Sequence, residues 1–319
     1  MTVVLTEAID QAGIDLLTAR AELRLVVAAP GDPAFEAALP DVLAIGVRVA
    51  RLDAALLSRA PRLRVAAKHG VGFDNIDVGY LAGRGIPVTV TADANSISVA
   101  EHTMTLMLAA AKHLRAYDDA VRQGDWEFRK SARAVELAGR RVLVVGFGRI
   151  GRRVAALCRA FGLHVLVHDI SAAALKQAAA AGYACAELDA GLAQADVLTL
   201  HIPLTARSAM LIDAPRLGRL PRGAVVVNCA RGGILDEDAL AQALTDGAIG
   251  AAALDVFGRE PIVQAHPLAS FDNVVLTPHS AATTREGARA MAVAMAQNIL
   301  DGIDGRLDPS CIVDPATAA

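Results

Sequence analysis

Cysteine, aromatic residues and net charge are all scarce in this chain of 319 residues. The four cysteines lie far apart and form no CxxC pair, so we expect neither a disulfide framework nor a zinc knuckle. Aromatic residues make up 3%, which is too little for a surface that stacks bases or sugars. A formal charge of −3 provides no positive electrostatic potential that would attract nucleic acid or an anionic membrane, so neither is an expected partner.

Long apolar runs and metal-binding patterns are missing as well. No uncharged apolar stretch approaches the roughly 18 residues that a membrane span needs. The first ten residues, MTVVLTEAID, have neither the basic segment nor the long apolar segment of a signal peptide. No HExxH motif or clustered Cys/His set occurs. We therefore expect a soluble cytoplasmic protein without a metal site.

Short β-branched runs alternate with longer Ala- and Leu-rich segments almost throughout the chain. Runs such as 42–47 and 141–145 predict strands, and stretches such as 53–59 predict helices. This alternation indicates βα units and a parallel sheet. Two successive series of such units predict two α/β domains, with a boundary near residues 95–100, where TADANS interrupts the pattern.

One long helical stretch, over 98–123, separates the two series. Apolar residues recur through it at helical spacing, and Gly124 ends it. The stretch is unusually apolar for a surface helix. It either packs on the core only or also forms a subunit interface, and we favour the interface, although periodicity does not separate the two.

A glycine motif lies within the sequence RVLVVGFGRIGRRV. Gly146, Gly148 and Gly151 form G-x-G-x-x-G between a predicted strand and a predicted helix. In that setting the first glycine makes a tight turn, the second lets a pyrophosphate approach the backbone, and the third lets helix and strand pack closely. The N–H groups of Arg149 and Ile150 at the helix start would hold the phosphates. The motif predicts a dinucleotide site.

An acidic residue ends the next predicted strand. Asp169 lies 21 residues after Gly148, close to the spacing of the carboxylate that binds the ribose hydroxyls of NAD. Such a carboxylate repels a 2′-phosphate, and Ile170 and Ser171 offer no positive charge to offset that repulsion. We therefore predict that the site binds NAD rather than NADP. The alternative is that the glycines form a structural turn and that the Asp caps a helix, and we favour the cofactor site.

Three later strand ends carry polar side chains. Arg231 follows AVVVN, Glu260 follows GAAALDVF, and His279 follows NVVLT. In a doubly wound sheet the ends of the strands converge on one crevice, where the ligand binds. Each residue alone is equally well explained as a solvated loop residue. Their occurrence at three strand ends predicts a shared site.

Six segments, in order, resemble the D-isomer-specific 2-hydroxyacid dehydrogenase family: KHGVGFDNID, ANSISVAEHTM, VGFGRIGRRVA, VVNCARGGILDEDAL, LDVFGREP and LTPHSAATT. The resemblance covers nearly the whole chain. It implies an α/β fold in which a Rossmann NAD-binding domain, 97–284, is inserted in a flavodoxin-like substrate domain, 1–96 and 285–319. It also implies a homodimer formed through the NAD-binding domain, which agrees with the long apolar helical stretch.

The resemblance implies that Arg231, Glu260 and His279 are catalytic. His279 would exchange a proton with the 2-hydroxyl group of the substrate while hydride passes between C2 and the nicotinamide. Glu260 would bind the other ring nitrogen and favour the imidazolium. Arg231 would bind the substrate carboxylate and polarise the carbonyl oxygen.

Further contacts follow from the same resemblance. Asp255 would face the carboxamide end of the nicotinamide, and other NAD contacts are expected at His201, Pro203, Cys229 and Ala230. Substrate contacts are expected at the backbone N–H groups of Gly70, Val71 and Gly72, in a turn that Asn75 would steady. Arg48 and Lys68 end two predicted strands, where they either bind a phosphate or second carboxylate or remain solvated rim charges.

The expected partner is a small 2-hydroxy acid or 2-oxo acid. Within the family the chain most resembles the branch that acts on 3-phosphoglycerate. With 40 residues after His279, we expect it to lack the regulatory extension of the longer members of that branch. Reduction of glyoxylate or hydroxypyruvate is therefore an alternative. A non-catalytic, corepressor-like protein that senses NAD is another.

Overall fold

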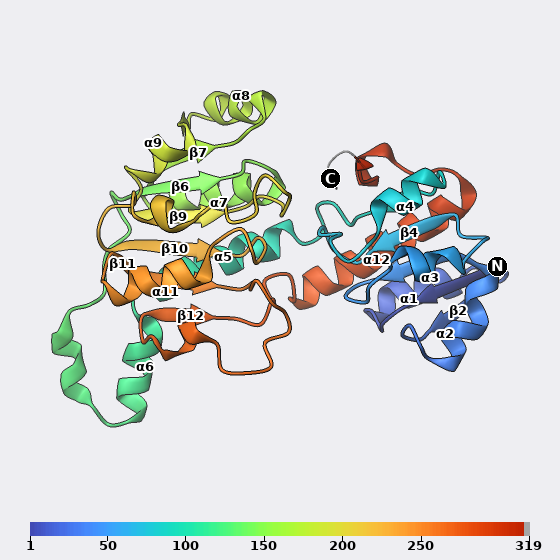
Figure 1. The fold of residues 1–319 in the computed structure, drawn as a ribbon, viewed down its shortest axis with the longest axis horizontal. Coiled ribbons are helices and arrows are strands. Elements are labelled where there is room, and N and C mark those ends of the chain that lie inside the picture. The colour runs from blue at the N-terminus through green and yellow to red at the C-terminus, as the bar shows by residue number, and fades with distance from the viewer. Residues whose placement is uncertain (316–319) are drawn as a thin grey trace. The chain divides into compact units, whose positions relative to one another are not determined.

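The computed structural model describes residues 1–315 and forms two compact units (Figure 1). One unit consists of Met1–Asn95 and the chain from Thr283 onward, and the other is Ser96–Ala282, so the second is inserted into the first. The last part of the predicted substrate domain, 316–319, lies outside the described residues. Within 1–315, no helix combines the length and apolar character needed to cross a membrane.

The first unit is built on a five-stranded parallel sheet in the order β2-β1-β3-β4-β5, the order of flavodoxin-like folds. Its strands are β1 (Thr2–Leu5), β2 (Arg24–Val27), β3 (Val42–Val47), β4 (Val65–Lys68) and β5 (Val88–Thr89). Its helices are α1 (Gln11–Thr18), α2 (Pro33–Ala38), η1 (Leu39–Asp41), α3 (Ala54–Ser58), α4 (Val78–Gly83), α12 (Arg285–Asp304) and η4 (Pro309–Cys311). Apolar side chains of α1 and α12 pack on one face, and those of α2, α3 and α4 pack on the other. Burial on both faces explains why the central strands read as continuous apolar runs.

The second unit is built on a seven-stranded parallel sheet in the order β12-β11-β10-β9-β6-β7-β8. Its strands are β6 (Arg141–Val145), β7 (His164–His168), β8 (Ala184–Cys185), β9 (Val197–Leu200), β10 (Ala224–Asn228), β11 (Ile249–Leu254) and β12 (Val274–Leu276). Its helices are α5 (Ser96–Ala111), α6 (Leu114–Arg122), η2 (Trp126–Ser131), α7 (Arg149–Ala160), α8 (Ala172–Ala180), α9 (Leu188–Leu192), α10 (Ala214–Leu217), α11 (Glu237–Thr245) and η3 (Pro267–Ser270). The order reverses between β6 and β9, as in a Rossmann fold, which confirms the predicted fold class.

The single helix predicted over 98–123 is wrong in one respect, because the chain forms two helices there. His113 adopts a left-handed conformation with φ of 49° between α5 and α6, and this interrupts the helical backbone. Apolar spacing continues on both sides of His113, so the pattern does not reveal the break. Helix α5 contributes many fully or largely buried residues to the core of its unit, which accounts for its apolar character.

Candidate active site

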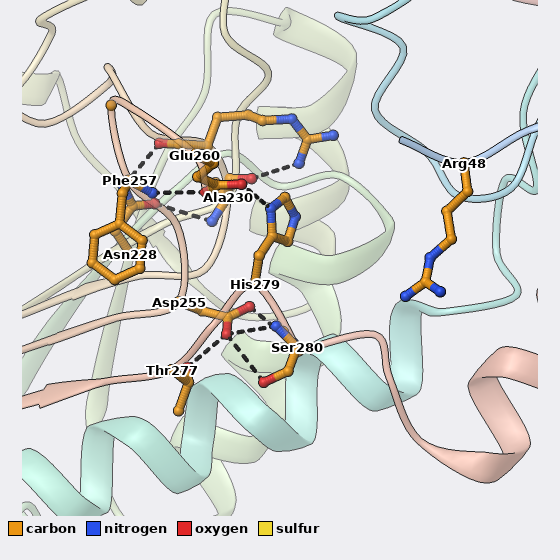
Figure 2. A network of polar contacts seen from close by, with 12 residues as sticks. Arg48, Asn228, Ala230, Asp255, Phe257, Glu260, Thr277, His279 and Ser280 are labelled. Atoms are coloured by element: carbon orange, nitrogen blue, oxygen red, sulfur yellow. Dashed lines mark hydrogen bonds and ion pairs between the residues drawn. The ribbon is translucent and has the colours of Figure 1, made fainter. Parts of the chain in front are cut away.

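Loops after β10, β11 and β12 carry Arg231, Glu260 and His279. The three strands are parallel neighbours, so their carboxyl ends lie at one edge of the sheet. Nδ1 of His279 lies 2.6 Å from Oε2 of Glu260, and Figure 2 shows the ring and the carboxylate facing each other. The charge of Arg231 acts on the same carboxylate. The structure therefore brings these three predicted site residues together within one unit.

Glu260 is stabilised as a carboxylate. Its Oε1 accepts a hydrogen bond from the N–H of Phe257 at 2.8 Å, and its Oε2 pairs with His279. Burial opposes ionisation, but the bonds from His279 and Phe257, helped by the charge of Arg231, lower the pKa of Glu260 below its usual value. Because Nδ1 of His279 is paired with this carboxylate, Nε2 is the ring nitrogen available for proton exchange.

The backbone of His279 is held in an unfavourable conformation. Its φ of 50° lies in the left-handed region, which costs a non-glycine residue roughly 1–3 kcal/mol and persists only where the surroundings hold it. The carbonyl of Asp255 accepts the N–H of His279 at 2.8 Å. The carboxylate of Asp255 accepts the N–H groups of Ser280 at 2.8 Å and Ala281 at 2.9 Å, and the hydroxyl of Thr277 at 2.6 Å (Figure 2). Asp255 therefore anchors the loop that presents His279.

The carboxylate of Asp255 is completely buried and has a further neighbour on α5. Nε2 of His102 lies 3.5 Å from Oδ1 of Asp255 and 3.1 Å from Oγ1 of Thr277. Burial opposes ionisation of Asp255, but hydrogen bonds from His102, Thr277 and the following loop lower its pKa. The expected contact of Asp255 with a nicotinamide stays a prediction. The part played by His102 was missed, since helical spacing alone marked it as a core or interface residue.

Asn228, the last residue of β10, folds the loop that carries Arg231. Its Oδ1 accepts the N–H of Ala230 at 3.0 Å, and its Nδ2 donates to the carbonyl of Arg231 at 2.9 Å. The guanidinium of Arg231 donates to the carbonyl of Ala230 at 2.6 Å. A Cβ at Gly232 would lie 1.8 Å from the carbonyl oxygen of Phe257, so only glycine lets the Arg231 loop approach the Glu260 loop this closely.

The glycine motif shapes a site that fits a dinucleotide. Gly146 has φ of 96°, and a Cβ there would lie 2.4 Å from the carbonyl oxygen of His201. A Cβ at Gly151 would lie 1.9 Å from the carbonyl oxygen of Gly146, so strand and helix pack without side chains at this point. Gly148 caps α7, and apart from its chain neighbours nothing lies within 4 Å of the position that a Cβ would take, so a phosphate group can approach the backbone there.

The start of α7 and the end of β7 complete that fit. Arg149 and Ile150 are the first residues of α7, and N–H groups in a first helical turn have no partner within the helix. Asp169 follows β7, and its carboxylate accepts the N–H groups of Phe147 at 2.7 Å and Ser171 at 2.8 Å. A carboxylate is thus fixed beside the glycine loop, where a ribose would need it.

The remaining predicted cofactor residues are not acid–base groups. Burial lowers the pKa of His201 to about 3, and its Nε2 lies 2.9 Å from the hydroxyl of Thr199, so the ring is neutral. Burial raises the pKa of Cys229 to about 12, which keeps its thiol protonated. Pro203 is exposed, and its carbonyl accepts the hydroxyl of Ser208 at 2.7 Å.

In the first unit, Lys68 and Asn75 hold the loop that begins with Arg48. Nζ of the buried Lys68 donates to the carbonyl of Arg48 and, at 2.6 Å, to Oδ1 of Asn75. Nδ2 of Asn75 donates to the carbonyl of Ala50 at 2.6 Å. Asn75 was expected to steady the Gly70–Gly72 turn, but its side chain bonds to the 48–50 loop because β3 and β4 are neighbouring strands. The side chain of Arg48 itself is exposed.

Glu7, which follows β1, holds the same loop by accepting hydrogen bonds from the backbone N–H groups of that loop. Its carboxylate accepts the N–H of Arg48 and of Val49 at 3.0 Å each, and of Ala50 at 2.8 Å. Sequence reasoning missed Glu7, since a carboxylate acting on a loop 41 residues away leaves no spacing signal.

The predicted substrate turn also lies in the first unit. Gly70 is buried with φ of 128°, and its N–H donates to the hydroxyl of Thr91 at 3.0 Å. Val71 and Gly72 are half-buried. Across residues 1–315, no group of three or more His, Cys, Asp or Glu side chains is arranged to hold a metal ion.

Comparisons with known proteins agree with this geometry. A profile of the D-isomer specific 2-hydroxyacid dehydrogenase family, NAD binding domain, matches residues 104–281. A D-3-phosphoglycerate dehydrogenase of Archaeoglobus fulgidus is 40% identical over 268 residues, which are 84% of this chain and 50% of that protein. A glyoxylate reductase of Aeropyrum pernix is 40% identical over 269 residues, which are 82% of this chain and 80% of that protein. The crystal structure of a D-lactate dehydrogenase of Aquifex aeolicus, complexed with NAD and lactic acid, superposes with a TM-score of 0.85 and 30% identity over 96% of each chain.

The chain spans about half the length of several phosphoglycerate dehydrogenases that it matches, at 50% of the Archaeoglobus protein and 52% of a Mycobacterium tuberculosis one. The family match covers more than half of the chain and lies almost entirely within the Ser96–Ala282 unit. That unit is therefore an NAD-binding domain.

Proposed function

The chain belongs to the D-isomer specific 2-hydroxyacid dehydrogenase family, and on that basis we propose that it transfers a hydride between NAD and a small D-2-hydroxy acid or its 2-oxo counterpart. The observation that carries the proposal is the 2.6 Å contact between His279 and Glu260, with the charge of Arg231 acting on the same carboxylate. An imidazole backed by a carboxylate beside a guanidinium is the set of groups that such a reaction requires.

The three side chains have distinct roles in this proposal. Nε2 of His279 takes the proton of the 2-hydroxyl group during oxidation and returns it during reduction. Glu260 fixes the ring through Nδ1 and stabilises the imidazolium that forms. The guanidinium of Arg231 forms paired hydrogen bonds with the substrate carboxylate and so orients C2.

The cofactor would be held by the glycine loop, by Asp169 beside that loop and by Asp255 at the end of β11. When bound, NAD supplies the acceptor for the hydride from C2, and NADH supplies the donor for the reverse reaction. Backbone N–H groups of Gly148, Arg149 and Ile150 hold the pyrophosphate, and Asp169 holds the ribose hydroxyls. Asp255 supports the nicotinamide end of the site through the loop that it anchors.

For the substrate we propose 3-phosphoglycerate, bound by the unit formed from Met1–Asn95 and the chain from Thr283 onward. Support comes from Arg48, an exposed cation directly after β3 whose backbone is held by Glu7 and Lys68 and whose guanidinium is suited to a phosphate. The N–H groups of the Gly70–Gly72 turn would bind the substrate carboxylate. A second candidate is glyoxylate or hydroxypyruvate, favoured by the similarity to the Aeropyrum glyoxylate reductase, of which the chain covers 80%.

We also propose a homodimer formed through the NAD-binding domain. Beyond the break at His113, the segment of α6 and η2 exposes Leu114 by 59%, Val121 by 61% and Trp126 by 64%. The backbone of this segment extends away from the sheet of its own unit (Figure 1). Exposed large apolar side chains on one such segment are typical of a surface that a second copy covers.

The purified protein tests the proposed activity directly. NAD is offered with a panel of D-2-hydroxy acids, and NADH with the matching 2-oxo acids, while NADH absorbance is followed. Turnover of at least one acid supports the proposal, and the ratio of kcat/KM values ranks 3-phosphoglycerate against glyoxylate and hydroxypyruvate. Tight NADH binding without turnover of any acid would favour an NAD-sensing binding protein instead.

A further inference from the structure

A second carboxylate–imidazole pair contacts the loop that carries Glu260. Glu237, the first residue of α11, places Oε2 at 3.0 Å from Nε2 of His266. The side chains of Glu237 and His266 are 19% and 16% exposed, against 33% for Glu260 and 49% for His279. The second pair is therefore more enclosed than the first and is not the one that presents a ring to a substrate.

The tautomer and the orientation of His266 are both fixed. Its Nδ1 accepts the N–H of Leu268 at 3.3 Å, so Nε2 carries the ring proton and donates it to Glu237. The ring also packs against Phe257, with centroids 5.2 Å apart. A ring held at both nitrogens and on one face provides a rigid support for the Glu237 carboxylate.

Phe257 links the two pairs through the peptide groups on either side of it. The other oxygen of Glu237, Oε1, accepts the N–H of Gly258 at 2.7 Å. The N–H of Phe257 donates to Glu260, and the carbonyl of Phe257 lies against Gly232, the residue after Arg231. The 256–257 peptide therefore contacts the carboxylate of Glu260, and the adjacent 257–258 peptide contacts both the loop of Arg231 and the pair of Glu237 and His266.

We propose that Glu237 and His266 are positioning residues, which hold the 257–258 peptide and, through the N–H of the adjoining Phe257, set the Glu260 carboxylate against His279. They touch neither substrate nor cofactor in this proposal. The activity readouts below rest on the proposed dehydrogenase function, whereas the titration of His279 does not.

Several charged groups surround these pairs and enter any pH dependence. Arg231 acts on Glu260 from the loop after β10, and Asp255 contacts the backbone of His279 from the end of β11. On α11, Asp236 accepts the N–H of Ala239 as the helix cap, and Asp238 is exposed on the same first turn. Asp238 therefore offers a matched control, since Asp238→Asn removes one negative charge from that turn and leaves the loop contacts intact.

Glu237→Gln is the informative variant. It keeps the shape of the side chain but turns an NH₂ group toward either the N–H of Gly258 or the ring N–H of His266, so one contact is lost. We expect kcat to fall about 10- to 100-fold through misplacement of Glu260, with NADH affinity and melting temperature close to those of the wild type. The alkaline limb of the kcat/KM profile for reduction should move to lower pH, as we also expect for Glu260→Gln, because the imidazolium of His279 is less stabilised. Asp238→Asn should match the wild type in all of these.

Titration of the His279 imidazole by NMR separates this inference from the proposed function. In Glu237→Gln the imidazole of His279 should titrate at lower pH than in the wild type. This expectation holds even if the wild type turns over no acid. His266→Gln, which keeps a donor for Glu237, should retain more of the wild-type titration and activity than His266→Ala, and this comparison stands if Glu237→Gln does not fold. A folded Glu237→Gln variant with wild-type titration of His279 and an unmoved pH limb would overturn the proposal.

Discussion

Asp255 holds the main chain at His279 and at the two residues that follow it. Its carbonyl accepts the N–H of His279 at 2.8 Å, and its carboxylate accepts the N–H groups of Ser280 and Ala281. These bonds maintain the left-handed backbone that aims the ring toward Glu260. A residue expected only to meet the cofactor thus also fixes the geometry of the proposed proton donor.

Asp255→Asn should therefore impair both turnover and stability. In the wild type the carboxylate accepts a hydrogen bond from each neighbouring N–H group and hydroxyl. The NH₂ of the amide would face one of these donors and leave it without an acceptor, at a cost of roughly 1–3 kcal/mol for a buried unsatisfied group. We expect kcat to fall about 100-fold as the loop of His279 shifts. Steady-state kinetics and thermal unfolding measure the two effects, with Thr277→Ser, which keeps its hydroxyl, as the mild control. Wild-type kcat in Asp255→Asn would contradict the anchoring role.

His279→Ala should abolish proton exchange with the substrate but leave the affinity for NADH nearly unchanged. General acid–base catalysis contributes about 10²- to 10⁴-fold, so kcat should fall within that range. NADH affinity, measured by fluorescence titration, should stay within a few-fold of the wild type, because the glycine loop and Asp169 are untouched. A loss of NADH binding that equals the loss of turnover would point to a structural role for His279.

Stability of the first unit should depend on pH through His69. Burial, with the charge of Arg48, lowers the pKa of this buried histidine to about 4. An unfolded histidine titrates near 6.5. Between these values the unfolded chain binds a proton that the folded chain does not, so stability falls as the pH falls through this window, by up to about 3 kcal/mol.

His69→Gln should flatten that dependence. Thermal unfolding at both ends of the window measures it, and His164→Gln, at an exposed histidine of the other unit, is the control. The same acid sensitivity in His69→Gln and in the wild type would show that other groups are responsible.

Glu7→Gln should weaken substrate binding selectively. The carboxylate accepts three N–H groups of the 48–50 loop, and an amide supplies only one acceptor oxygen. A less ordered Arg48 should raise KM for an acid with a second anionic group about tenfold, with NADH affinity unchanged. Glu22→Gln, at an exposed position of the same unit, is the control. An equal rise in KM for glyoxylate, which has no second anionic group, would argue against Arg48 as its cause.

Trp126→Asp should dissociate the proposed homodimer. An aspartate in the centre of an apolar interface leaves a buried charge without a partner, which costs several kcal/mol. Sedimentation velocity should change from dimer to monomer for Trp126→Asp but not for Phe161→Asp, at a comparably apolar exposed position of the same unit. A wild-type protein that sediments as a monomer would exclude the proposed dimer outright.

The fold and the cofactor loop could be predicted because their signals are local. Alternating apolar runs mark the strands. The glycine motif between a strand and a helix predicts close backbone packing, and in the structure a Cβ at Gly146 or Gly151 would collide with a carbonyl oxygen. The break at His113 could not be predicted, since apolar spacing continues through it. Supporting contacts such as Glu7 with the 48–50 loop join residues that are distant in sequence, and only the pairing of strands brings them into reach.

The chain passes between its two units only at residues 95–96 and 282–283. Arg231, Glu260, His279 and all the residues that brace them lie between those two junctions, whereas Arg48 and the Gly70–Gly72 turn lie outside them. Recombination at these two junctions would therefore exchange the unit that we propose to determine substrate specificity. It would leave the residues proposed for hydride transfer unchanged. Chimaeras made from two relatives with different substrates offer a way to alter specificity without rebuilding the reaction centre.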